Sequence, residues 1–179
     1  SAIRNFSRSC HQSNPLKNKY IQTMIPAEHS LFFVAFFFFC SRSFSEGEKK
    51  TIVQSNARLA ANYITREVRY AEEISTTSFN TCHCLKLEDN TLKEIIKKDG
   101  VIQSTREITR DSCLTDLSFR LESDDHGKAV LFFIITGGDE MLRNDFKIES
   151  EVLLVNIRDL NGVTLEGSEI FFTKPTVEE

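Results

Sequence analysis

The sequence predicts an α+β protein in which one long amphipathic helix, near the N-terminus, packs on an antiparallel β-sheet. Two observations predict this class. Between residues 46 and 75, apolar residues recur at spacings of three and four, the period of a helix with one buried face. After residue 79 the period becomes two, and no helical period returns. A helix followed only by strands is typical of an antiparallel sheet rather than of alternating α/β layers.

The predicted helix covers residues 46–75. Ser45 and Glu48 have the spacing of a capping box at its beginning, and no Pro or Gly interrupts residues 48–75. Many side chains on its apolar face are small, which allows a second layer to approach closely. We therefore expect a packing and assembly face that consists of Ala57, Ala60, Ile64, Val68 and Ala71.

Seven later segments have the pattern of strands. Asp89-Asn90 and Lys98-Asp99-Gly100 are turn signals that separate strands. Ala129–Ile135 is continuously apolar, which favours a central strand, and Gly137-Gly138-Asp139 ends it. The predicted strands are Cys82–Glu88, Thr91–Ile96, Val101–Ile108, Leu114–Leu121, Ala129–Ile135, Asp145–Asn156 and Ile170–Phe172.

The first 45 residues differ in composition from the rest of the chain. They contain five basic residues and one acidic residue, which gives a net charge of +4. The whole chain carries −4, so the remaining residues carry −8. They also contain eight of the 15 Phe and neither Gly nor Asp. We therefore predict two parts, an atypical N-terminal segment over residues 1–45 and a globular domain over residues 46–179.

Leu31–Cys40 is an unbroken apolar run of ten residues in the N-terminal segment. A helix that spans a bilayer needs about 20 such residues. Three interpretations remain open: an export or anchoring segment, a buried strand or helix of the domain, and sequence foreign to the natural protein. We expect residues 1–45 to contribute little to the folded core, because of the charge split between the two parts and because a self-sufficient helical pattern begins at Glu46.

No catalytic or cofactor-binding motif is present in the sequence. Phosphate-binding loops, dinucleotide-binding glycine motifs, GxSxG and HExxH are all absent, and the four His have no telling spacing to a carboxylate or Ser. The net charge of −4 gives no indication of nucleic-acid binding. We expect no catalytic residue, no cofactor and no metal, and therefore a protein that is not an enzyme.

Three of the five cysteines could form a cluster. Cys82 and Cys84 lie on the same face of a predicted strand, and Cys113 precedes another strand. A disulfide from Cys113 to Cys82 or Cys84 is one interpretation, and buried reduced thiols are another. A zinc site fits poorly, because a single residue separates the first two cysteines and no second pair is near Cys113.

The stretch Gln54–Ile74 resembles the exposed half of the long helix in minor pilins and pseudopilins of the type IV pilin-like family. Within it, Arg66-Glu67-Val68-Arg69-Tyr70-Ala71 matches the family's Arg-Glu-Ile/Val-Arg-x-Ala pattern. The resemblance covers roughly residues 46–172 and includes the later strands Leu117–Phe119, Val130–Ile135 and Glu151–Arg158. The family's leader ends in Gly before an apolar helix, whereas the first Gly here is Gly47.

The resemblance implies a pilin-like fold and a non-enzymatic role by filament assembly. It implies a minor subunit of a type IV pilus, or of a type II secretion or competence pseudopilus, at the cell surface and outside the cytoplasm. The implied partners are other pilin or pseudopilin subunits and the inner assembly machinery, with the membrane contacted through the N-terminal segment. The alternative is an extracytoplasmic ligand-binding or regulatory domain that is anchored through residues 31–40.

Overall fold

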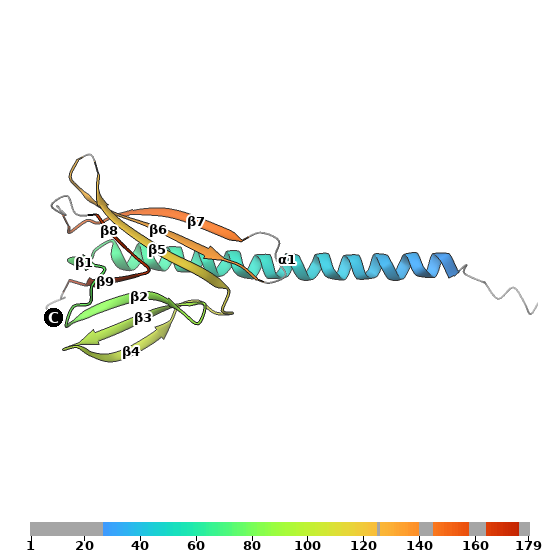
Figure 1. The fold of residues 1–179 in the computed structure, drawn as a ribbon, viewed down its shortest axis with the longest axis horizontal. Coiled ribbons are helices and arrows are strands. Elements are labelled where there is room, and N and C mark those ends of the chain that lie inside the picture. Colours follow the sequence, from blue (N-terminus) through green and yellow to red (C-terminus); the bar gives the residue numbers. More distant parts are fainter. Residues whose placement is uncertain (1–26, 125, 140–144, 158–163, 176–179) are drawn as a thin grey trace, which may run out of the picture. The chain divides into compact units, whose positions relative to one another are not determined.

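The computed structural model describes residues 27–124, 126–139, 145–157 and 164–175. Within these ranges a single long helix, α1 (Ala27–Val68), precedes nine strands (Figure 1). The predicted α+β class is therefore confirmed. The strands are β1 (Glu73–Ser75), β2 (Cys82–Glu88), β3 (Thr91–Lys98), β4 (Val101–Glu107), β5 (Leu114–Ser123), β6 (Ala129–Gly137), β7 (Phe146–Leu153), β8 (Leu165–Gly167) and β9 (Glu169–Thr173).

The chain divides into two compact units, residues 1–42 and residues 43–179. The described part of the first unit is the beginning of α1. The second unit contains the rest of α1 and every strand named above, so it holds the whole hydrophobic core.

Both predicted ends of the helix are wrong. The helix already includes the residues before position 46, so Ser45 lies inside α1 and does not cap it. At the other end α1 stops at Val68, and Glu73–Ser75 form β1 instead. Ile74 of β1 lies opposite Phe172 of β9. Pairing with a strand that is distant in sequence therefore replaces the last predicted turns of helix.

The strands form two antiparallel sheets rather than one. The five-stranded sheet has the order β1-β9-β2-β3-β4, and the four-stranded sheet has the order β7-β6-β5-β8. The C-terminal strand β9 lies between β1 and β2, where Phe171 is opposite Cys84. The predicted bounds of β2 are confirmed, and β6 occupies an inner position as predicted from its apolar run. The short strands β1 and β8 were not predicted.

Two turns have the backbone that their sequences predict. Asp89 and Asn90, between β2 and β3, have φ angles of 53° and 59°. Asp99 and Gly100, between β3 and β4, have φ angles of 54° and 76°. Positive φ at both central residues is typical of a type I′ turn, which connects the two strands of a tight hairpin.

Side chains of α1 and of both sheets share one hydrophobic core. The five small or branched side chains predicted for the helix face, Ala57, Ala60, Ile64, Val68 and Ala71, are all 0% exposed. The approach between α1 and β6 is close enough to require Gly137. A Cβ atom at this position would lie 2.8 Å from Cγ1 of Val53 and 3.2 Å from the carbonyl oxygen of Cys113.

Candidate functional site

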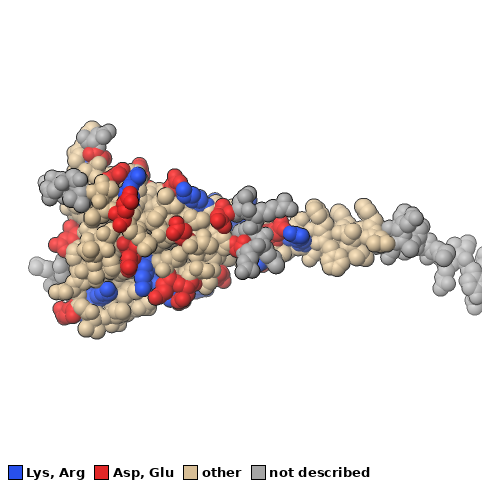
Figure 2. All heavy atoms as spheres, in the orientation of Figure 1, with Lys and Arg blue, Asp and Glu red and all other residues tan. Residues whose placement is uncertain are grey.

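The most unusual surface of the described chain is a run of exposed apolar side chains on α1, which we call the phenylalanine segment. Their exposed fractions lie between 51% and 76%. The described side chains before Arg42 carry no charge, and Figure 2 shows this run of α1 without acidic or basic atoms. The segment consists of Leu31, Phe32, Phe33, Val34, Phe36, Phe37, Phe38, Phe39 and Phe44.

The phenylalanine segment is apolar around the whole helix rather than on one face. Consecutive positions such as Phe36 to Phe39 point in different directions, yet all four are more than half exposed. Contacts among the rings are mostly local, for example between Phe32 and Phe36, whose centroids are 6.4 Å apart. The described residues of their own unit therefore do not bury these side chains. No described helix is long and apolar enough to cross a membrane.

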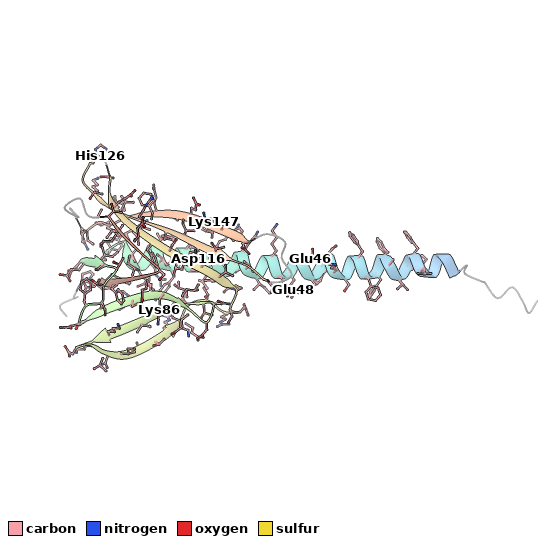
Figure 3. All side chains as sticks on the ribbon, in the orientation of Figure 1. Glu46, Glu48, Lys86, Asp116, His126 and Lys147 are labelled. Carbon is pink, nitrogen blue, oxygen red and sulfur yellow. The ribbon has the colours of Figure 1, made fainter. Side chains whose placement is uncertain are left out.

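Among the described side chains of α1, charges begin at Arg42, near the end of the phenylalanine segment. Glu46 and Glu48 follow it on α1 (Figure 3). The Lys49 ammonium donates to Asp139, just after β6, with an Nζ–Oδ1 distance of 2.8 Å. This ion pair joins α1 to the loop after β6, within the second unit. Its side chains are each about one-third exposed, so we expect only a small contribution to stability.

A buried polar network connects the middle of α1 to the five-stranded sheet. The Tyr63 hydroxyl donates to Glu94 Oε2 over 2.6 Å, and His83 Nδ1 donates to Glu94 Oε1 over 2.9 Å. The Glu94 side chain on β3 is only 5% exposed. The hydrogen bond from His83, together with that from Tyr63 and the Lys174 charge, lowers the pKa of Glu94 to about 2, although burial opposes this shift.

The network extends to the surface through Lys174, which follows β9. Its ammonium lies 2.6 Å from Glu67 Oε2 on α1 and 3.5 Å from Glu94 Oε1. Burial raises the pKa of Tyr63, and the hydrogen bond to the Glu94 carboxylate raises it further. Tyr63 therefore stays a neutral donor, and the arrangement fixes α1 against β2, β3 and the end of β9.

The sequence interpretation missed this network, although one signal for it exists. Leu92, Glu94 and Ile96 alternate along β3, so the carboxylate occupies a position on an otherwise apolar face. Opposite it on β2 lies Leu85, and His83 lies opposite Ile96. A carboxylate and an imidazole on the core face of paired strands predict mutual hydrogen bonding, because buried polar groups need partners.

The four described cysteines all carry free thiols. Cys82 and Cys84 share one face of β2, as predicted, and pack with Ile95 and Phe171 in a small cluster outside the main core. Burial, followed by the nearby Glu169 carboxylate, raises the pKa of Cys84 to about 12. Cys113 is buried but does not belong to that cluster, and the structure has no disulfide from it to Cys82 or Cys84.

No group of three or more His, Cys, Asp or Glu side chains in the described ranges could hold a metal ion. The polar network could be considered as a catalytic group, because it includes a Tyr, a His and a Glu. However, its carboxylate is buried, accepts hydrogen bonds from Tyr63 and His83, and lies 3.5 Å from the Lys174 ammonium. The arrangement therefore holds elements of the fold together.

Comparison with known proteins shows a likeness of fold. No protein-family model matches the chain, and no curated protein matches it. Among solved structures, the chain is similar to a mutant of the PilB minor pilin from Streptococcus sanguinis, with a TM-score of 0.55 and 14% sequence identity. The match covers 73% of this chain and 36% of that one, so this chain spans about a third of its length. The long helix on antiparallel sheets is thus a pilin-like α+β fold.

Proposed function

We propose that this protein is a pilin-like subunit that assembles with other subunits through the phenylalanine segment of α1. The observation that carries the proposal is the exposure of nine large apolar side chains on one helix. Burial of such a side chain contributes about 1.5–3 kcal/mol. Covering several of them in a bundle of helices therefore offers a large driving force for assembly.

The pilin-like fold of residues 43–179 supports this role, and so does the family pattern at Arg66–Ala71. In a filament, the phenylalanine segments of neighbouring subunits pack together, while the two sheets of each subunit remain at the surface. The proposed setting is a minor subunit of a type IV pilus, or of a type II secretion or competence pseudopilus. The partners would be other pilin or pseudopilin subunits and the assembly machinery, outside the cytoplasm.

Cysteine cross-linking tests whether the segments pack specifically. Cys40 is exposed and lies within the apolar run, whereas the other described cysteines are buried. The chain with Cys10→Ser is oxidised with diamide, and disulfide-linked dimers are measured on non-reducing gels. The exposed cysteine is then moved from position 40 to position 41 or 43, and the buried cysteines stay in place. Packing of helices predicts cross-linking that depends on position with a helical period, while uniform cross-linking would indicate nonspecific aggregation and contradict the proposal.

Light scattering after size exclusion measures how much the phenylalanine rings contribute to the formation of oligomers. Phe37→Ser/Phe38→Ser should shift the full chain from oligomers to monomers and leave thermal melting unchanged. The matched control is Val101→Ser/Ile102→Ser on β4, which removes two apolar side chains elsewhere that are also more than half exposed. A monomeric wild-type chain that binds lipid vesicles would instead favour the anchored-domain alternative.

A further inference from the structure

The outward side of the four-stranded sheet contains an open hollow of about 810 Å³. Its floor is apolar, because Phe132 and Ile134 of β6 point away from the core and are only half-buried. The charged side chains that line it come from β5, β7 and β8 and are Arg120, Glu149, Glu151 and Glu166. The hollow is therefore an apolar surface with an acidic rim.

The rim has more carboxylates than cations that pair with them. The Arg120 guanidinium lies 5.0 Å from the centroid of the Phe132 ring, and its Nε is 3.3 Å from Glu122. Glu149 is paired with Lys147. Neither Glu151 nor Glu166 forms an ion pair with a residue that the structure describes. An apolar floor beside such carboxylates fits Lys or Arg side chains, which combine an aliphatic stem with a positive charge.

The hollow lies beside β7, which is an edge strand among the strands that the structure describes. Strand β7 pairs with β6 along its whole length and has no described strand on its other side. Its outer edge therefore presents backbone N–H and C=O groups that can bind another strand. Glu149 and Glu151 are two residues apart, so both point to the hollow and are about 7 Å apart along the strand. An extended chain beside β7 repeats its side chains at the same interval.

We propose that β7 and the acidic rim bind an extended segment of a partner polypeptide that has Lys or Arg at two alternate positions. The segment adds to the sheet beside β7, and its basic side chains lie next to Glu149 and Glu151. Main-chain hydrogen bonds supply affinity, and the two carboxylates set the register. A slip by one residue would turn the basic side chains toward the core-facing side, at Ile148 and Ser150.

The charges on the outward side of the four-stranded sheet change along β7. Lys147, near the beginning of β7, and Asp116, on β5, flank Thr136 in one cross-strand row (Figure 3). In that row the two charges are of opposite sign. The row of Glu151 also has a cation, because Arg120 on β5 lies on the other side of Phe132, whereas the row of Glu149 contains Ile134 and Ser118 and no cation. The position of the acidic pair therefore specifies where along β7 the basic residues of a ligand bind.

A set of synthetic peptides tests the proposal on the full chain. The probe is fluorescently labelled Thr-Lys-Val-Lys-Val-Thr, and binding is followed by anisotropy at low and high salt. We expect saturable binding that weakens with salt. Three matched peptides carry Glu in place of Lys, the two Lys at adjacent positions, or N-methyl groups on alternate amides. All three should bind at least several-fold more weakly, because they lose charge, register or main-chain pairing respectively.

Two matched protein variants locate the site. Glu149→Gln/Glu151→Gln should weaken binding of the probe by about tenfold, as the loss of two exposed ion pairs implies. Glu72→Gln/Glu73→Gln makes the same change of charge on exposed residues elsewhere and should leave binding unchanged. Thermal melting checks that both variants are folded. Equal affinity for both variants, equal binding of the N-methylated peptide, or no saturable binding at millimolar concentrations would each overturn the proposal.

Discussion

Replacing Glu94 by Gln tests the buried polar network that holds α1 on the five-stranded sheet. The substitution keeps the size of the side chain and removes its charge. The amide loses the charge-assisted hydrogen bond from His83 and the ion pair with Lys174, and it offers only one oxygen to the donors that surround it. Because the site is almost fully buried, solvent compensates little for these losses.

The pH dependence gives the expected magnitude. The pKa of Glu94 falls from 4.5 to about 2 on folding. At about 1.4 kcal/mol for each pKa unit, the ionised carboxylate stabilises the fold by about 3 kcal/mol. Because the folded pKa is the lower one, this contribution is complete above about pH 5 and decreases as the pH falls toward 2. About half of it should remain at pH 3.

Urea unfolding followed by circular dichroism measures this contribution. The wild-type chain and Glu94→Gln are compared at pH 7, 5, 4 and 3, so that the titration of every other carboxylate cancels in the difference. The wild type should be more stable by about 3 kcal/mol at pH 7 and by roughly half as much at pH 3. Glu107→Gln, an exposed substitution on β4, is the control. A difference that stays constant from pH 7 to 3 would refute the reasoning.

Two further predictions concern the packing of α1, and urea unfolding of matched pairs checks both. Ala60→Asp should destabilise the fold by about 3–5 kcal/mol, because it buries an unpaired charge, whereas Leu59→Asp, at a position that is 47% exposed, should cost far less. Gly137→Ala should destabilise by about 1–3 kcal/mol through the contact with Val53. By contrast, Gly47→Ala has no atom within 4 Å of its new Cβ and should stabilise α1 by about 0.5–1 kcal/mol. Equal effects within either pair would contradict the packing described.

Local patterns in the sequence predict the strands well, because hairpins are specified by neighbouring residues. The bounds of β2 and the turn at Asp89-Asn90 follow from alternation and from residues that tolerate positive φ. The division into two sheets does not follow from such patterns. It depends on β9, which pairs with β2 and β1 across most of the domain, and on β8, which is only three residues long.

The polar network could not be predicted from local patterns either, because its members are far apart in the sequence. Tyr63 and Glu94 are 31 residues apart in the sequence, and Lys174 lies beyond β9. Nothing in the local sequence around any one of these residues indicates the other two. Only the topology places β3, α1 and the end of β9 side by side. The alternation of Glu94 with apolar residues indicates burial, but it does not identify the donors that satisfy the carboxylate.

The beginning of α1 escaped prediction for a different physical reason. Helical periodicity appears only where one face of a helix is buried and the other is exposed. From Val53 to Val68 the sheets of the same chain bury one face, and the period is clear. From Leu31 to Phe39 the side chains are exposed and apolar in every direction, so no period exists to be found. A helix that is apolar all round needs partners on all sides. The residues at which the periodicity argument fails are therefore the same residues for which we propose assembly with other subunits.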